Sequence, residues 1–358
     1  VGPALRELAH PWDGTRPFSH FVPFLARPHR TLTLIQKQIG TVLTHGTQRQ
    51  LDQLQDKVSL FLQEQKDMIF YTAEDAHGGT MLCATVPDLT DQFRQTLWRQ
   101  QKPMVLASGT LAVGEDFHRF KEATGLLTDG RVRESVSPSP FAYSKNCLLY
   151  VPSLPARQKA GQYYDKLTEE ITALLDAAHG HALVLFTSYS AMAAVKERLR
   201  DQNLAYPLFT LGRNAIHTTK LFKNTPGGVL LATGAAWEGF DFPGDCVSLL
   251  VIPRLPFPIP DALKEKEREQ YPTLHAFLRA VVVPEMQIKL KQGFGRAIRT
   301  ETDTCVVAIL DERAAKDQRY WKDVLAALPE IPITQDLHQV EAFIRGVKPD
   351  RYFQEGAA

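Results

Sequence analysis

The spacing of hydrophobic residues changes along the chain, and its first part follows a helical pattern. Between residues 31 and 66, apolar side chains recur every three or four positions, with a break at Gly46. This spacing predicts two amphipathic helices, one over residues 31–44 and one ending near residue 66, because it places the apolar side chains on one face. We expect a helical hairpin that packs on a sheet domain. Residues 1–30 show little periodicity and are expected to be irregular or to form short helices.

Two strand patterns follow the predicted hairpin, at residues 68–72 and 81–86, with a turn at Gly78 and Gly79 before the second. Residues 74–77 lie between them and read Glu-Asp-Ala-His. We interpret this stretch as a solvated loop, because its acids are in the wrong order for a DExH motif and no strand runs directly into it.

A helical pattern at residues 89–100 precedes an apolar run at residues 103–107. We expect this run to form a buried strand that ends at Ser108 and Thr110. Small hydroxyl residues at a strand end are typical of the ligand edge of an α/β sheet. A further helix is expected over residues 116–124, and the segment 136–140, rich in proline and serine, is the predicted linker.

Beyond the linker, strand and helix patterns alternate regularly. Short apolar runs predict parallel strands, and amphipathic segments predict the helices between them. The predicted strands cover residues 147–151, 182–187, 207–211, 229–232, 247–252 and 305–310, and the predicted helices cover 160–177, 190–204 and the region of 287–299. This order predicts an α/β fold with a doubly wound parallel sheet, preceded by a mostly helical N-terminal segment.

The segment of residues 287–299 is basic and helical in pattern. Gln292, Arg296 and Arg299 recur at helical spacing, so we expect their side chains on one face. A second face is apolar and carries Leu290, Phe294 and Ile298. A surface helix with solvated arginines would show the same spacing, so the pattern alone leaves two interpretations open.

Two glycines distinguish this segment from an ordinary helix. Gly293 and Gly295 each disfavour a helix interior by about 1 kcal/mol relative to alanine. Their presence indicates that another backbone or a ligand comes close, and the neighbouring Gln292, Arg296 and Arg299 favour a phosphate as that ligand.

Composition narrows the class of protein only slightly. The chain has 358 residues, of which 44% are hydrophobic and 23% are charged, as in a soluble protein of two domains. Its net charge of +1 means that a polyanion would be held by local patches. Four cysteines without a CxxC pair argue against a zinc or iron–sulfur site built by this chain alone, and we expect no bound metal. The sequence has no apolar run long enough to span a bilayer and no signal-peptide pattern, so we expect a cytoplasmic protein without membrane contacts.

Two loops at predicted strand ends carry polar groups. After residues 229–232 come Thr233 and a loop with three glycines and two carboxylates, Glu238 and Asp241. Backbone N–H groups of such a loop can hold a phosphate, although a turn with a capping acid would look the same. Similarly, Thr187, Ser188 and Tyr189 stand at another strand end, where hydroxyls cap the next helix or contact a phosphate backbone.

Taken together, these segments resemble one family. Four stretches occur in the order and spacing of motifs III, IV, V and VI of superfamily 2 helicases, namely residues 108–110, 186–189, 233–244 and 292–299. Trp-Glu-Gly-Phe-Asp-Phe-Pro-Gly at 237–244, Leu-Pro-Phe-Pro at 255–258 and Gln-Gly-Phe-Gly-Arg-Ala-Ile-Arg at 292–299, with Ile-Leu-Asp at 309–311, resemble the DinG branch of the XPD-like (Rad3-related) DNA helicases. The resemblance covers about residues 80–330.

The resemblance implies a role for each matching residue. Arg296 and Arg299 would act as arginine fingers on the γ-phosphate of ATP, and Gln292 would hold that phosphate or its attacking water. Coupling of nucleotide state to DNA is implied for six residues, Glu238, Gly239, Asp241, Gly295, Ser108 and Thr110. DNA contacts are implied for five, Thr187, Ser188, Tyr189, Thr233 and Trp237. Gly109 departs from the more common Ser-Ala-Thr form of motif III.

The same resemblance implies a domain organisation of RecA-like units. Residues 1–80 would be the remnant of a helical arch-like insertion, 81–135 the last strands of a first RecA-like domain, and 136–358 a complete second one. The chain begins with Val1-Gly2-Pro3 and not with methionine, so we expect it to be a fragment of a longer polypeptide.

Two elements of such a motor are missing from the sequence. Neither the GxxxxGK[ST] phosphate loop nor a DExH box occurs in it, so the lysine that grips the phosphates and the carboxylate that holds Mg²⁺ are not supplied by this chain. An iron–sulfur cluster in the parent protein would likewise need ligands from outside it. We therefore expect ATP and Mg²⁺ to serve the full-length protein and this chain alone to hydrolyse no ATP.

Three functions agree with these observations. The first is the C-terminal part of an ATP-dependent 5′–3′ DNA helicase, nucleoid-associated and monomeric, acting on single-stranded, forked or displaced-loop DNA. The second is a non-catalytic nucleic-acid-binding module derived from a helicase. The third, an unrelated α/β nucleotide-binding enzyme, would require the four motif matches to be coincidental.

Overall fold

The computed structural model describes residues 22–39, 44–63, 68–74, 80–100, 102–126, 131–153, 160–202, 204–212 and 215–354. These residues fall into two compact units. The smaller lies within Val1–Gln100, Ala123–Leu126 and Ile259–Leu274, and the larger lies within Gln101–Glu122, Leu127–Pro258 and His275–Ala358. The division does not follow the chain in order, because a segment late in the sequence belongs to the smaller unit.

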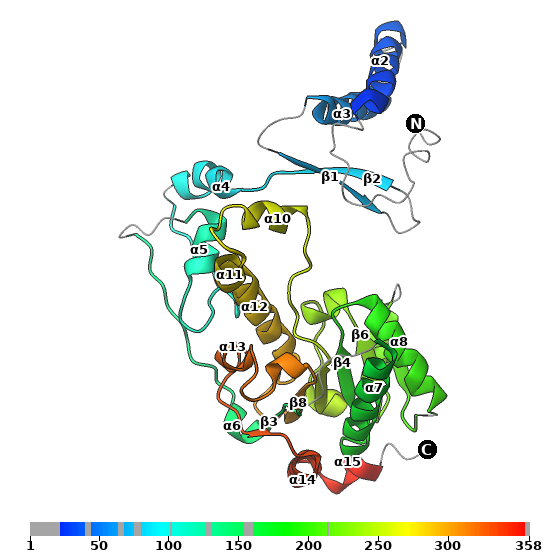
Figure 1. Cartoon of the computed structure of the whole chain (residues 1–358), viewed down its shortest axis with the longest axis vertical. Helices are drawn as coiled ribbons and strands as arrows, with labels where there is room; N and C mark the ends of the chain where they lie inside the picture. Colours follow the sequence, from blue (N-terminus) through cyan, green and yellow to red (C-terminus); the bar gives the residue numbers. More distant parts are fainter. Residues whose placement is uncertain are drawn as a thin grey trace. The chain divides into compact units, whose positions relative to one another are not determined.

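In the smaller unit, α2 (Val22–Ile39) and α3 (His45–Leu62) form the predicted helical hairpin (Figure 1). The first helix begins at Val22 and not at residue 31, so the expectation of irregular structure or short helices is wrong for residues 22–30. Two hydrogen bonds show that the helices run antiparallel: Nε2 of His29 lies 3.1 Å from Oγ of Ser59, and Nε2 of Gln36 donates to Oδ1 of Asp52 at 2.7 Å. The predicted break at Gly46 is wrong. Thr44 caps α3 by accepting from the N–H of Thr47, which places the glycine inside the first turn.

The smaller unit also contains an antiparallel pair of strands, β1 (Ile69–Glu74) and β2 (Thr80–Thr85), as the strand patterns predicted. The glycine turn and residues 75–77 lie outside the described residues. Helix α4 (Thr90–Thr96), a 3₁₀ turn η3 (Trp98–Gln100) and helix α10 (Ala262–Arg268) complete this unit. The indole N–H of Trp98 donates to the carbonyl of Thr124 at 2.7 Å and ties the end of α5 (His118–Thr124) to it.

The buried strand predicted over residues 103–107 is wrong. Residues 102–108 have no regular structure, and Val105 is 92% exposed. A parallel strand forms only where a neighbour supplies the other half of its hydrogen bonds, and no described strand pairs with this segment. The apolar run therefore lacks the partner that its sequence pattern implies.

The larger unit is built on a seven-stranded parallel sheet (Figure 1). The strand order is β5-β6-β4-β7-β8-β3-β9, and every neighbouring pair is parallel. The strands are β3 (Cys147–Tyr150), β4 (Ala182–Leu185), β5 (Leu208–Thr210), β6 (Val229–Ala232), β7 (Leu249–Ile252), β8 (Cys305–Ile309) and β9 (Ile333–Thr334). Most of these strands are fully buried, which explains why they read as continuous apolar runs.

Helices cover both faces of this sheet, so the predicted doubly wound α/β fold is confirmed. The helices are α6 (Tyr143–Asn146), α7 (Ala160–Ala177), α8 (Tyr189–Asp201), α9 (Ala215–Lys223), α11 (Leu274–Phe277), α12 (Val283–Phe294), α13 (Trp321–Ala327), α14 (Leu337–Val347) and α15 (Asp350–Gln354). A π-helical turn, η6 (Leu278–Val282), leads into α12, and short 3₁₀ turns are η4 (Gly234–Trp237), η5 (Gly244–Val247) and η7 (Glu312–Ala314).

Successive strand residues face two separate cores. Leu183 and Leu185 of β4 point to the face covered by α9, α12 and α13, while Ala182 and Val184 point to the face covered by α7, α8 and α14. This alternation follows from the two-residue period of a strand. Each face buries a contiguous apolar cluster, and the sheet holds the loops at its carboxyl edge between the two layers.

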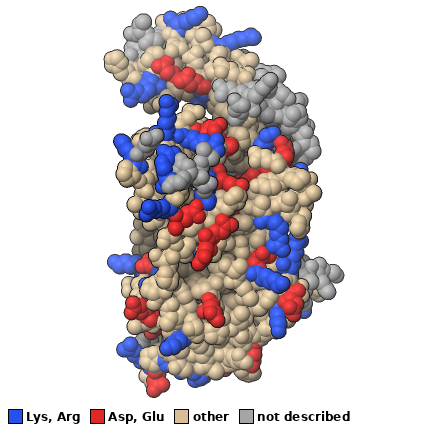
Figure 2. Space-filling view, turned by 90° about the vertical axis from the view of Figure 1, so that its left-hand side faces the viewer, with Lys and Arg blue, Asp and Glu red and all other residues tan. Residues whose placement is uncertain are grey.

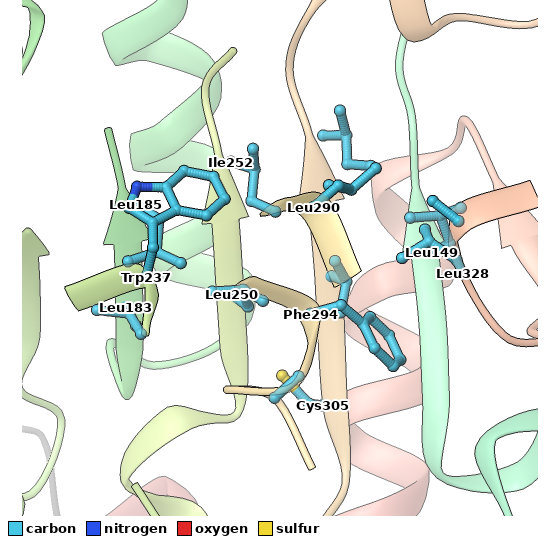
Figure 3. Packing of buried hydrophobic residues seen from close by; sticks show 14 of the residues in the cluster. Leu149, Leu183, Leu185, Trp237, Leu250, Ile252, Leu290, Phe294, Cys305 and Leu328 are labelled. Carbon is cyan, nitrogen blue, oxygen red and sulfur yellow. The ribbon is translucent and has the colours of Figure 1, made fainter. Parts of the chain in front are cut away.

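A glycine determines how α12 packs against the sheet (Figure 3). Trp237 is only 1% exposed and lies beside Leu185, and its indole N–H donates to the carbonyl of Phe186 at 3.0 Å. A Cβ atom added to Gly293 would lie 2.7 and 2.8 Å from two carbons of that indole. Gly293 is therefore required because the chain's own tryptophan, and not an external ligand, comes close at this point.

A buried histidine lies at the other edge of the sheet, just before β4. The N–H of Gly227 donates to Nε2 of His181 at 3.1 Å, so Nε2 is unprotonated and Nδ1 carries the hydrogen that points to the carbonyl of His179, 3.0 Å away. Burial is the main cause that lowers the pKa of His181. The charge of Asp245 acts to raise this pKa and the charge of Lys348 acts to lower it, so these two effects oppose each other. The folded structure thus selects the neutral ring.

Replacing Gly293 with alanine should lower the free energy of unfolding. Overpacking against Trp237 costs about 1–3 kcal/mol, and this outweighs the roughly 1 kcal/mol by which alanine favours a helix. Gly346→Ala in α14 is the matched control, because its Cβ would meet nothing within 4 Å; it should stabilise by about 0.4–1 kcal/mol. Urea unfolding measures both, and stabilisation by Gly293→Ala would contradict the packing described here.

Acidification should destabilise the larger unit through His181. The unfolded chain binds a proton near the ordinary pKa of 6.5, whereas the folded chain does not, so stability is complete above that pH and falls below it. The slope for one such group approaches about 1.4 kcal/mol per pH unit. Unfolding free energies between pH 7 and 5 should fall less in His181→Gln than in the wild type, while His217→Gln, at an exposed position, should match the wild type. Equal slopes in all three proteins would exclude His181 as the source.

Candidate functional site

The predicted site residues that follow β4 and β6 come together at the carboxyl edge of the central strands. Thr187, Ser188 and Tyr189 follow β4, and the loop of residues 233–244 follows β6, the strand beside β4. Helix α12 packs on the face of the sheet to which Leu183 and Leu185 point. Arg296, just after this helix, bonds to the β6 loop. Because the strands are parallel, all of these loops leave the sheet at one edge.

Helix α12 ends earlier than the sequence pattern predicted. Its last residue is Phe294, and Gly295 closes it by donating to the carbonyl of Lys291 at 3.0 Å. Turn hydrogen bonds follow, from Arg296 to the carbonyl of Gly293 and from Ala297 to that of Phe294. The expectation that Gln292, Arg296 and Arg299 share one helical face is therefore wrong, since only Gln292 lies within the helix.

Arg296 is a buried side chain with two carbonyl partners. It is 8% exposed, and its Nε donates to the carbonyl of Trp237 at 3.1 Å while Nη1 donates to that of Phe240. Burial and, secondly, the nearby charge of Arg299 lower the pKa of Arg296, while Asp241 and Glu238 act in the opposite direction. Arginine remains charged under all ordinary conditions. Its guanidinium therefore serves to attach the β6 loop to the end of α12.

Arg299 has a different environment. Its side chain is 31% exposed, and Nε lies 2.9 Å from Oδ1 of Asp241, whose carboxylate is largely exposed. A weaker contact of 3.5 Å joins Nη2 to the carbonyl of Phe240. Arg299 is thus the arginine of the pair that an anion from solvent can reach, and Asp241 is the group that neutralises it here.

The remaining residues predicted for nucleotide coupling lie in three segments: the β6 loop, the end of α12 and residues 108–110. Glu238 and Gly239 are exposed in the β6 loop, and Gln292 is partly buried in the last turn of α12. Ser108 and Thr110 bond to each other, with 3.3 Å between the two hydroxyl oxygens. Among the described residues, no hydrogen bond joins these hydroxyls to Arg296 or Arg299.

The residues predicted to contact DNA separate into accessible and buried ones. Tyr189 is 70% exposed, and its hydroxyl lies 3.7 Å from where a Cβ of Gly234 would stand, so the loops after β4 and β6 meet there. Ser188 caps α8 by accepting from the N–H of Ala191 at 3.2 Å. Thr233 is buried, and Trp237 belongs to the core, which leaves its indole no surface for a base.

One interaction at this edge had no role in the sequence interpretation. Asp311, after β8, is almost completely buried and accepts from the N–H of Leu255 at 2.9 Å. Arg313 donates to both of its oxygens at 2.9 and 2.7 Å. Burial acts to raise the pKa of Asp311, but these hydrogen bonds together hold it below its usual value. The carboxylate fixes the Leu-Pro-Phe-Pro loop after β7, and only the spacing Asp-x-Arg hinted at it.

Charge is distributed without a single dominant field. On the face drawn in Figure 2, described lysines and arginines lie among carboxylates instead of forming one continuous basic surface.

Within the described ranges, no group of three His, Cys, Asp or Glu side chains could hold a metal ion. No helix in the described parts of the chain is long and apolar enough to cross a membrane.

Comparison with known proteins identifies the larger unit. Residues 171–331 match the family model for the helicase C-terminal domain. These residues resemble a helicase C-terminal domain, and we use that name for them below. They contain strands β4 to β8, helix α12 and both arginines, but not Ser108 or Thr110.

The predicted resemblance to DinG-type, XPD-like helicases is confirmed. The chain is 32% identical to the ATP-dependent DNA helicase YoaA of Haemophilus influenzae over 72% of its length and 40% of that protein. It is also 32% identical to the ATP-dependent helicase DinG of Mycobacterium tuberculosis, over 79% of its own length and 43% of that protein. The chain thus spans about two fifths of these relatives.

A solved structure of an XPD helicase has the same fold as this chain. It superposes with a TM-score of 0.56 at 17% identity, over 85% of this chain and 55% of the XPD chain. The seven-stranded parallel sheet of the larger unit is therefore of the RecA-like type, as predicted.

The two arginines of the helicase C-terminal domain should differ in their effect on stability. Arg296→Ala leaves the carbonyls of Trp237 and Phe240 without their buried donor and should lower the free energy of unfolding by about 1–3 kcal/mol. Arg299→Ala removes a partly exposed ion pair and should cost less than about 1 kcal/mol. Urea unfolding of the two variants side by side measures the difference, and equal losses would show that Arg296 does not attach the β6 loop.

Proposed function

We propose that this chain is the C-terminal part of an ATP-dependent DNA helicase and that its helicase C-terminal domain is the second of two motor domains. The observation that supports this most strongly is the accessible guanidinium of Arg299 beside the β6 loop. The buried Arg296 holds that loop. Relatives named as ATP-dependent helicases share this part of the sequence. In this proposal residues 136–358 form the second motor domain, 81–135 complete the first, and 1–80 are the remnant of an arch-like insertion.

Arg299 acts on the phosphate in the proposed reaction. Its planar guanidinium presents several N–H donors, which suits an anion with negative charge on several oxygens. Bound ATP and Mg²⁺ would supply the phosphoryl group and part of the charge neutralisation, and the side chains that hold the metal would come from outside this chain. Gln292 binds the same phosphate or its attacking water. Arg296 holds the loop that carries Glu238 and Asp241.

Asp241 has a defined part in this proposal. In the structure its carboxylate neutralises Arg299, so a phosphate that approaches the guanidinium competes with it. An exchange of partners would move the β6 loop, which joins the DNA-facing edge at Gly234 and Tyr189. Glu238, Gly239 and Gly295 belong to the same moving region. Ser108 and Thr110 transmit hydrolysis between the two motor domains.

Single-stranded DNA is the proposed second ligand. Tyr189 offers an exposed aromatic ring on which a base can stack, and the hydroxyls of Thr187 and Ser188 stand beside it for a backbone phosphate. We assign Thr233 a backbone role and give the side chain of Trp237 none. The enzyme moves 5′ to 3′ as a monomer on single-stranded, forked or displaced-loop DNA, in the cytoplasm at the nucleoid.

The decisive experiment is hydrolysis of ATP by the full-length protein with Arg299→Ala. Loss of an arginine finger lowers turnover by about 10³–10⁵-fold, so the variant should lose DNA-stimulated hydrolysis and unwinding. Its affinity for single-stranded DNA should be retained, because the DNA contacts proposed here belong to Thr187, Ser188 and Tyr189. Arg345→Ala is the control, since that arginine is an exposed ion-pair partner on α14 and should leave turnover unchanged.

The isolated chain of 358 residues provides the second arm. It should bind single-stranded DNA with an affinity that falls steeply as salt is added, because basic side chains release counterions from phosphates, and it should hydrolyse no ATP. Normal turnover by Arg299→Ala in the full-length protein would refute the arginine-finger role. DNA binding by a full-length protein that hydrolyses no ATP would instead favour the non-catalytic module.

A further inference from the structure

A buried carboxylate connects the arginine segment to the β6 loop. Asp303 is 5% exposed and accepts hydrogen bonds on both oxygens. Oδ2 receives the backbone N–H groups of Arg299 and Thr300, each at 2.8 Å. Oδ1 receives the hydroxyl of Thr300 at 2.6 Å and the N–H of Gly244 at 3.2 Å. The carboxylate thus joins the turn that contains it to Gly244, which is 59 residues earlier in the sequence.

The geometry of both segments depends on this carboxylate. Gly244 ends the loop that carries Glu238 and Asp241, and its φ of +77° turns its N–H toward Asp303 in a conformation that favours glycine. Arg299 lies at the start of the turn that leads to β8, and Asp303 holds its backbone from the other side. The distance between Arg299 and Asp241 is therefore fixed by Asp303 without contact to either side chain's charged end.

The turn that contains Asp303 is itself fixed. The amide of Asn146 donates to the carbonyl of Glu301 at 2.9 Å, and Nζ of Lys348 donates to that of Thr304 at 3.0 Å. Lys348 also pairs with Asp245, the residue that follows Gly244, at 2.7 Å. Hydrogen bonds from two other parts of the larger unit thus hold the turn, so Asp303 has little freedom to follow a loop that moves.

We propose that Asp303 is a positioning residue that sets the register between the Arg299 backbone and the 238–244 loop. The register itself follows from the hydrogen bonds of Asp303. Its expected effect on catalysis rests on the proposed function. Asp303 touches no nucleotide. It acts through Arg299, whose guanidinium must lie at the right distance to contribute to phosphoryl transfer.

The ionised form of Asp303 is the form that makes these bonds. A carboxylate accepts at both oxygens, whereas an asparagine of the same shape presents one oxygen and one NH₂ donor. Burial acts to raise the pKa of Asp303, but the hydrogen bonds from Thr300, Arg299 and Gly244 together hold it below its usual value. In Asp303→Asn, the NH₂ group takes the place of one carboxylate oxygen and then faces the backbone N–H groups that bonded to that oxygen. Two donors cannot bond to each other, so either Gly244 or the Arg299–Thr300 segment is released in each orientation of the amide.

The first test measures backbone hydrogen exchange in the isolated chain. In Asp303→Asn, the amides of the released segment, either Gly244 or Arg299 with Thr300, should exchange at least about tenfold faster while the strands of the sheet stay protected. Asp336→Asn is the matched control, because Asp336 is an exposed capping carboxylate that accepts from the N–H of His338 at 2.9 Å. Unchanged exchange at the three amides would overturn the proposed register.

The second test measures hydrolysis by the full-length protein at saturating single-stranded DNA. Misplacing a catalytic group by about 1 Å costs roughly 10²-fold, so kcat should fall about 10–100-fold in Asp303→Asn. KM for ATP should stay within about threefold, because the lost interaction belongs to the transition state. A rise in KM with kcat unchanged would overturn the inference.

A double variant separates positioning from general damage. If Asp303 acts through Arg299, then Arg299→Ala combined with Asp303→Asn should be no slower than Arg299→Ala alone, whereas independent effects would multiply. Multiplied losses would assign Asp303 a purely structural role. A wild-type enzyme without activity would count against the proposed function only, and the exchange rates would still decide the register.

Discussion

The indole of Trp237 fits against α12 only because residue 293 has no side chain, and the arrangement of the site depends on this contact. The tryptophan belongs to the η4 turn after β6, while Gly293 lies in the last turn of α12. Their contact brings a loop and a helix end together across the sheet face. The carbonyl of Trp237 then accepts from Arg296, so packing and hydrogen bonding act at the same point.

The two arginines illustrate how adjacent basic residues can have separate tasks. Arg296 satisfies carbonyl groups in the interior, where an unbonded polar group would be costly. Arg299 is partly exposed and has an exposed carboxylate as its partner, an arrangement that costs little to open. A rigid support for the loop and an accessible cation for a phosphate are thus provided by residues three positions apart.

Several features could be predicted from the sequence because their causes are local. Apolar runs bounded by helical patterns identify the parallel strands, and the four motif segments identify the edge at which the site forms. The strand predicted at residues 103–107 failed for a different reason. Its apolar pattern is local, but a strand also needs a pairing partner, and none of the described strands lies beside it.

The sequence by itself determined the succession of predicted strands and helices along the chain, the doubly wound fold class and the resemblance to DinG-type helicases. These features depend on the spacing of residues along the chain. Only the tertiary structure decided that Trp237 is core, that Arg296 is buried while Arg299 is accessible, and that Asp303 joins two loops. Those properties arise from contacts between residues about 60 positions apart, and the burial of a side chain is determined by such neighbours and not by its own type.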